Sequence, residues 1–161
     1  MTMTKNHLMG GHHKVIKPGV LAGIGGGAAE IVWIIAVGAL TNVSAVDVSR
    51  GVGASLGIEA ASSTLAVAIG VTIHMALAIA LGIVVAAGCR ALMGRSFRTA
   101  RAYVVVPTAL IGVWAFNFFV LLPLINPAFV ELVPYSVSFP SKLMFGLAAA
   151  EILRRDASND A

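Results

Sequence analysis

The chain has 161 residues, of which 58% are hydrophobic and 11% are charged. About a quarter of the residues of a soluble globular domain are charged, so this composition excludes the soluble class and predicts an integral membrane protein in contact with the lipid bilayer. The net charge of +4 does not indicate a nucleic-acid partner, because the basic residues are divided among three short flanks of the apolar segments.

Residues 1–17 are polar and predict a flexible cytoplasmic tail. His7, His12 and His13 in this tail are candidate metal ligands, since imidazoles bind divalent metal ions. No carboxylate or cysteine accompanies them in the tail, so a solvated segment is the simpler interpretation.

Four apolar segments follow and predict an all-α fold, a four-helix transmembrane bundle. The predicted spans are residues 20–40, 65–87, 103–125 and 139–153. At ~1.5 Å per residue, the first three can cross a hydrocarbon core of ~30 Å, whereas the fourth reaches only ~22 Å. We expect a single membrane domain over residues 18–155 and a C-terminal tail over residues 156–161.

The two remaining linkers carry different signals. Residues 41–64 are rich in glycine and small residues and predict a short helix at the membrane interface. Residues 126–140 contain Pro127, Pro134 and Pro140, so they cannot form one regular helix. They form either a partly inserted irregular element or the kinked start of the fourth span.

Lys and Arg concentrate on one side of the predicted spans, as they do in short cytoplasmic loops. Nine of the 11 basic residues lie in the N-terminal tail, the loop between the second and third spans, and the C-terminal tail: Lys5, Lys14, Lys17, Arg90, Arg95, Arg98, Arg101, Arg154 and Arg155. We therefore expect both termini to be cytoplasmic. Cys89 lies on the same side, and as a single cysteine it cannot form an internal disulfide.

The two halves of the chain resemble each other. In the first span of each half, a tryptophan lies three residues from a polar residue: Trp33 from Glu30, and Trp114 from Asn117. This pattern indicates either a parallel two-span repeat or the ordinary likeness of two apolar hairpins.

Glycines recur at helical spacing beside the polar residues of the spans. Gly19, Gly23 and Gly27 precede Glu30; Gly70 and Gly82 flank His74; and Gly146 follows Lys142. Small residues four positions apart let two membrane helices approach closely. The polar residues are therefore expected to face other helices rather than lipid.

Glu30, His74, Asn117 and Lys142 are predicted to form an intramembrane polar cluster. Counted along straight helices from the cytoplasmic side, their heights agree within ~6 Å. Charged groups at such depth are costly in isolation and pair with one another, which makes Glu30 and Lys142 the expected ion pair. The cluster either fixes the register of the helices or takes part in function.

Two functions of different classes follow. The first is an accessory or assembly subunit of a larger membrane complex, docked through glycine-rich helix faces onto membrane-protein partners or further copies of itself. The alternative is a small oligomeric transporter or channel component that moves protons, metal cations or a small anion through the polar cluster. No cofactor and no catalytic group is predicted, although a haem or metal with His74 as one ligand stays an alternative.

The spans contain the segments HMALAIALG, FNFFVLLPLINPAF and KLMFGLAAA after a glycine-rich first span. In these features the chain resembles uncharacterised small four-span proteins of the bacterial inner membrane. The resemblance covers most of the chain, and it implies a four-span topology and a location in the bacterial cytoplasmic membrane.

Overall fold

The computed structural model describes residues 5–41, 43–93 and 100–159, and every regular element within them is a helix. The elements in chain order are α1 (Lys5–Leu40), α2 (Ala45–Ala54), α3 (Ser63–Met93), α4 (Ala102–Phe116), the π-helical turn η2 (Asn117–Leu121), α5 (Leu122–Ile125), α6 (Pro127–Leu132) and α7 (Tyr135–Asn159). The predicted all-α fold is confirmed.

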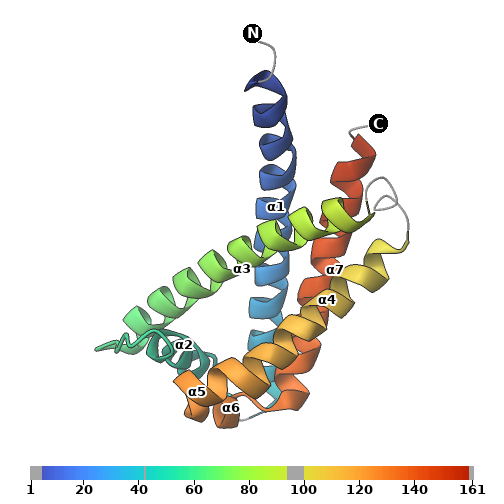
Figure 1. Cartoon of the computed structure of the whole chain (residues 1–161). Coiled ribbons are helices and arrows are strands. Elements are labelled where there is room, and N and C mark those ends of the chain that lie inside the picture. Colours follow the sequence, from blue (N-terminus) through green and yellow to red (C-terminus); the bar gives the residue numbers. More distant parts are fainter. Residues whose placement is uncertain (1–4, 42, 94–99, 160–161) are drawn as a thin grey trace.

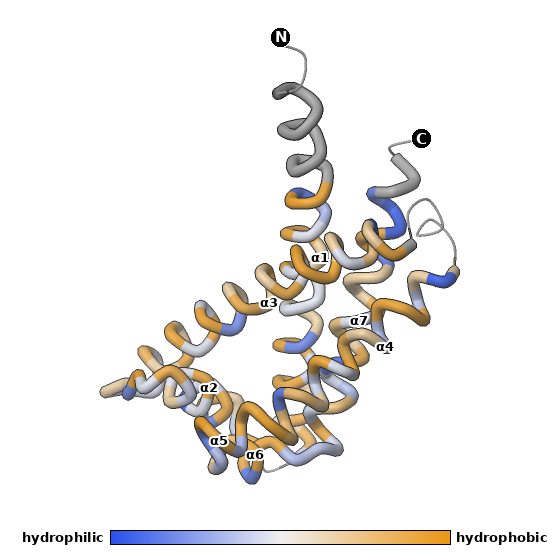
Figure 2. The backbone as a smooth tube through the Cα atoms, viewed as in Figure 1, coloured by the Kyte–Doolittle hydropathy of each residue, from blue (hydrophilic) through white to orange (hydrophobic). Residues whose placement is uncertain are grey.

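Three stretches of helix in the described residues are long and apolar enough to cross a membrane. They are Val15–Leu40, Ser63–Leu92 and Ala102–Ile125, which contain the first three predicted spans. Figure 2 shows hydrophobic residues along most of α3 and α4 and at many coloured positions of α1. The predicted fourth span lies in α7, which is 25 residues long but mixes charged and hydroxyl side chains with apolar ones.

The first helix begins earlier than the sequence analysis expects. α1 starts at Lys5 and passes Pro18, so helix extends through most of the segment that was predicted as a flexible tail. Once a helix has formed, each added residue gains a hydrogen bond without the cost of a new nucleus. The apolar span can therefore extend the helix into the polar residues before it.

The long helices pack side by side in the order α3, α1, α7, α4 (Figure 1). α1 contacts α3 along one side and α7 along another, and α4 packs on α7. Contacts between α3 and α4 are few, so the four helices do not close into a ring as a regular four-helix bundle would. The central core contains Ala22, Ala78, Leu110, Phe145 and Ala149.

The short helices α2, α5 and α6 gather at the end of the molecule opposite the start of α1 and the end of α7 (Figure 1). α2 is a short helix of the kind predicted for residues 41–64. Asn126 ties two of these elements together: its side chain caps α6, and its Nδ2 donates to Gly51 O at 3.1 Å and Ser55 Oγ at 3.0 Å. This end of the molecule is therefore joined by side-chain hydrogen bonds.

The segment between Asn126 and Pro140 does not form one regular helix. α6 ends at Leu132 and α7 begins at Tyr135, so the chain breaks before Pro134 as expected. Pro140 nevertheless lies inside α7. Proline inside a helix removes one backbone hydrogen bond, and packing against neighbouring helices offsets that cost in membrane proteins.

Candidate functional site: a buried polar cluster

Glu30 is buried among three helices, with only 5% of its surface exposed. One carboxylate oxygen, Oε1, lies 2.7 Å from the Lys142 ammonium and accepts a hydrogen bond from Ser141 Oγ at 3.1 Å. Lys142 and Ser141 are consecutive residues of α7, whereas Glu30 belongs to α1. The structure therefore places Glu30 and Lys142 together as an ion pair that links these two helices.

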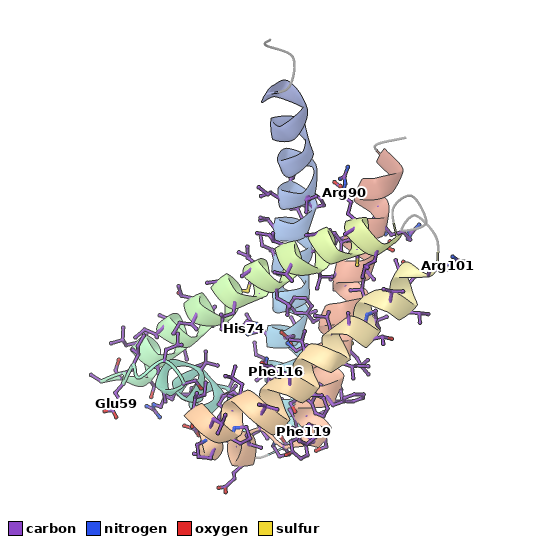
Figure 3. The ribbon with its side chains drawn as sticks, viewed as in Figure 1. Glu59, His74, Arg90, Arg101, Phe116 and Phe119 are labelled. Atoms are coloured by element: carbon purple, nitrogen blue, oxygen red, sulfur yellow. The ribbon has the colours of Figure 1, made fainter. Side chains whose placement is uncertain are left out.

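The other oxygen of Glu30 faces α3. His74 Nε2 lies 3.8 Å from Glu30 Oε2 and 3.2 Å from the backbone oxygen of Gly27. A carbonyl oxygen can only accept a hydrogen bond, so the contact with Gly27 assigns the proton of the neutral imidazole to Nε2. Figure 3 shows His74 at the side of α3 that faces the other long helices.

Lys142 is held by an aromatic ring as well as by Glu30. Its Nζ lies 5.1 Å from the centre of the Phe145 ring, one helical turn further along α7. Phe145 is fully buried, and a Cβ built on Gly26 would lie 2.6 Å from this ring. Gly26 thus leaves the space on α1 that Phe145 fills, a packing role that the predicted row of Gly19, Gly23 and Gly27 misses.

That row forms the contact between α1 and α3. A Cβ on Gly19 would lie 2.6 Å from Ile83 Cα, and a Cβ on Gly23 would lie 2.5 Å from Ala78 O. From the other helix, a Cβ on Gly82 would lie 2.4 Å from Gly19 O. Gly27 faces the side chains of Ala78 and Met75. The close approach of these two helices brings His74 to Glu30.

The two other glycines of the prediction face different neighbours. A Cβ on Gly70 would lie 2.5 Å from Ser49 O of α2, and a Cβ on Gly146 would lie 2.8 Å from Pro107 Cα of α4. Gly70 therefore seats the short helix α2 on α3, and Gly146 brings α4 against α7. Neither partner follows from a row of small residues along one helix.

Asn117 is not joined to the cluster by any hydrogen bond or ion pair among the described residues. It opens the π-helical turn, where Leu122 N donates to Asn117 O across five residues instead of four. Similar heights along neighbouring helices do not by themselves bring side chains together, because the direction of each side chain also depends on the rotation of its helix.

The indole groups of the two tryptophans donate hydrogen bonds to the beginning of α7. Trp33 Nε1 donates to Val137 O at 2.9 Å, and Trp114 Nε1 donates to Ser138 Oγ at 3.1 Å. Trp114 also contacts four aromatic rings at centroid distances of 5.2 to 6.0 Å: Phe118, Phe119, Tyr135 and Phe139. The π-helical turn lets the consecutive Phe118 and Phe119 both reach Trp114.

A second charged group lies at the end where α1 begins. Glu151 pairs with Arg154 at 3.1 Å and with Arg155, as the sequence spacing indicates, and it also accepts a hydrogen bond from Tyr103 Oη. Figure 3 places Arg90 and Arg101 at this end and Glu59 at the opposite end. Basic residues of α3, α4 and α7 therefore share one end of the molecule.

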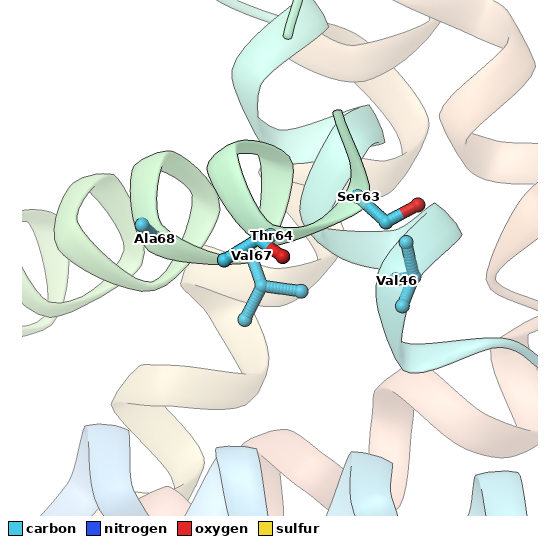
Figure 4. A pocket seen from close by; sticks show the side chains of 5 residues that line it. All are labelled: Val46, Ser63, Thr64, Val67 and Ala68. Carbon is cyan, nitrogen blue, oxygen red and sulfur yellow. The ribbon is translucent and has the colours of Figure 1, made fainter. Parts of the chain in front are cut away.

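The remaining surface features lie away from Glu30. A shallow apolar depression of about 480 Å³ lies between α2 and the first turns of α3, lined by Val46, Ser63, Thr64, Val67 and Ala68 (Figure 4). In the part of the chain that the structure describes, no three His, Cys, Asp or Glu side chains are grouped as a metal site. The side chains of His7, His12 and His13 lie outside that part.

The cluster holds one carboxylate, one ammonium, one imidazole and one hydroxyl group from three helices. Such a set can exchange and hold protons, and it can also fix the register of the helices that carry it. Compared with protein-family models, curated proteins and solved structures, the chain matches none.

Proposed function

We propose that this chain is an accessory or assembly subunit of a larger membrane complex. We place it in the bacterial cytoplasmic membrane with four spans, α7 being the fourth, and with both termini in the cytoplasm. The shared end of the basic residues supports this topology, because Lys and Arg favour the cytoplasmic side.

The observation that carries the proposal is a row of small residues exposed on α3. Four small residues of α3 recur every four positions and are all exposed: Ala68, Thr72, Ala76 and Ala80. The face of α3 that contains Gly82 packs instead on α1. Small residues at this spacing let a further helix approach the backbone closely. The exposed row is a surface that no helix of this chain covers.

The pairing of the buried polar groups with one another supports the same function. In the described part of the chain, no buried side-chain nitrogen or oxygen lacks a hydrogen-bond partner. Glu30, Lys142 and Ser141 satisfy one another, and the cluster serves to join α1 to α7. The outer faces of the helices are then what the chain offers to partner proteins.

Gentle purification of the protein from its native membrane in nanodiscs, followed by mass spectrometry, tests the proposal. We expect larger membrane proteins in stoichiometric amount with the wild-type chain and with His74→Ala. The variant Ala76→Leu should lose them while remaining folded, because the added side chain projects from an exposed position.

Gly112→Leu is the matched control, since Gly112 is exposed on α4 and a Cβ there meets nothing within 4 Å. It should keep the partners if they dock on α3. A preparation that contains only this chain, from a membrane in which its natural partners are present, contradicts the accessory function.

The alternative function is a transporter or channel component for protons, metal cations or a small anion. Its support is the irregular end of the third span, where the π-helical turn and Pro123 change the backbone hydrogen bonding before the helix ends at Asn126. Interrupted helices mark the ion and substrate sites of many transporters. Ion flux into proteoliposomes that Glu30→Gln abolishes in a folded protein would favour this alternative.

A further inference from the structure

The two oxygens of the Glu30 carboxylate have separate partners. Oε1 contacts Lys142 and Ser141 of α7, and Oε2 faces His74 of α3. Because the ammonium and the hydroxyl converge on one oxygen, the other is directed at the imidazole. The carboxylate can therefore accept a hydrogen bond from His74 while it keeps Lys142.

The geometry points to a proton-binding site inside the membrane domain, made by His74 and Glu30. Nε2 carries the proton of the neutral imidazole because it faces Gly27 O, so an incoming proton is taken by Nδ1. The resulting imidazolium keeps Nε2–H directed at Gly27 O and Glu30 Oε2. The ligand of this site is a proton, and the site is independent of the proposed accessory function.

His74 is the accessible member of the cluster. Its side chain keeps 27% of its exposure, compared with 16% for Lys142 and 6% for Glu30. An imidazole is also the side chain whose ordinary titration falls between about pH 5 and 8. His74 is therefore the least enclosed titratable side chain of the cluster.

Among the described residues, Glu30 is the one charged group in direct contact with His74 and is therefore its counter-ion. On α1 that group is Glu30, and Lys142 of α7 acts on His74 through it. On α2, Arg50 pairs with Asp47 and donates to Ser63, which lies 11 residues before His74 and so ~16 Å away along α3. Arg101, which directly precedes α4, lies toward the opposite end of α3 (Figure 3), and Tyr103 of α4 is hydrogen-bonded to Glu151 of α7.

Protonation changes the charge balance of the cluster. Before it, Glu30 and Lys142 cancel; after it, two cations share one carboxylate in a poorly hydrated place. Glu30 then compensates His74 through Oε2 and Lys142 through Oε1. Proton binding to His74 therefore adds an ion pair between α1 and α3 to the one between α1 and α7.

The test is nitrogen-15 NMR of the histidine ring in phosphatidylcholine nanodiscs. The chain has four histidines, so replacing His7, His12 and His13 with Asn leaves His74 alone, and the further variant His74→Asn assigns its signals. We expect a reversible change from the Nε2–H tautomer to the imidazolium between about pH 8 and 5. A ring that stays neutral throughout this range overturns the proposal.

Two variants give opposite shifts if Glu30 is the counter-ion. At a fixed pH, Glu30→Gln should lower the ratio of imidazolium to neutral imidazole by about tenfold, because the neighbouring opposite charge is removed. Lys142→Met should raise that ratio, because Glu30 is then free to compensate His74 alone.

Glu151→Gln is the matched control: it removes the carboxylate of the other charged group and should leave the His74 titration unchanged. An unchanged titration in both Glu30→Gln and Lys142→Met overturns the site. If Glu30→Gln does not fold, the direction of the Lys142→Met shift decides alone. None of these results depends on partner proteins. A failure of the proposed accessory function would therefore be detected separately, by the purification and mass spectrometry.

Discussion

Glu30 shows how a charged side chain is accommodated at membrane depth. The residue is 5% exposed, and its carboxylate contacts an ammonium, a hydroxyl and an imidazole. An ionised carboxylate in an apolar environment is stable only when paired and hydrogen-bonded. The pairing of Glu30 with Lys142 could be predicted, because these are the two oppositely charged residues at similar depth. The hydrogen bond from Ser141 could not be predicted, since the sequence places this residue beside Lys142 without showing where either side chain points.

Removing one member of this pair should be more harmful than removing both. Glu30→Gln leaves Lys142 as an uncompensated buried cation, and such a change costs about 3–5 kcal/mol. The double variant Glu30→Gln with Lys142→Met removes both charges and should recover most of that loss. Thermal unfolding of the purified proteins in detergent measures the difference. Equal destabilisation of the single and double variants would show that the ion pair is not what matters at this position.

At the scale of the element, α1 is shaped by its glycines on two sides. Gly19 and Gly23 meet α3, and Gly26 meets Phe145 of α7. Spacing by four residues predicts one packing face, and the contact with α3 has that spacing. The contact with α7 depends instead on one large ring opposite one glycine, for which the sequence pattern has no signal.

The glycines of α3 allow a matched comparison. Gly82→Ala places a Cβ 2.4 Å from Gly19 O, backbone that cannot move away easily, so it should destabilise the protein by about 1–3 kcal/mol. Gly88→Ala adds a Cβ that meets nothing within 4 Å and should stabilise the helix by about 0.5–1 kcal/mol. The melting temperatures of the two variants should move in opposite directions. A melting temperature of Gly82→Ala equal to that of the wild type would contradict the close approach of α1 and α3.

At the scale of the whole molecule, the long helices form an open row in the order α3, α1, α7, α4. A closed bundle would pack α3 against α4, whereas here their contacts are few and the row of small residues on α3 stays exposed. The beginning of α1 and the end of α7 lie at one end of the molecule, opposite α2, α5 and α6 (Figure 1). This arrangement is consistent with α7 as a fourth span.

The crossing of the membrane by α7 can be tested with single cysteines. In a Cys89→Ala background, Glu131→Cys and Asp156→Cys place thiols before and after α7. With four spans and both termini in the cytoplasm, a membrane-impermeant maleimide added to intact cells should label position 131 and spare position 156. Lysed cells should show labelling at both positions. Labelling of both positions in intact cells would mean that α7 does not cross.

The sequence by itself determined that the protein is helical and that three of its helices are long and apolar enough to cross a membrane, because long apolar segments need internally hydrogen-bonded backbone in lipid. It also identified Glu30, His74 and Lys142 as polar residues at similar depth in the predicted spans, where an unpaired charge is costly. Only the tertiary structure decided that Gly70 and Gly146 meet α2 and α4, and that α3 and α4 do not close the row. It also decided that Asn117 makes no hydrogen bond or ion pair with Glu30, His74 or Lys142 among the described residues. Those outcomes depend on the rotation and tilt of each helix about its neighbours, which are set by contacts between side chains distant in the chain.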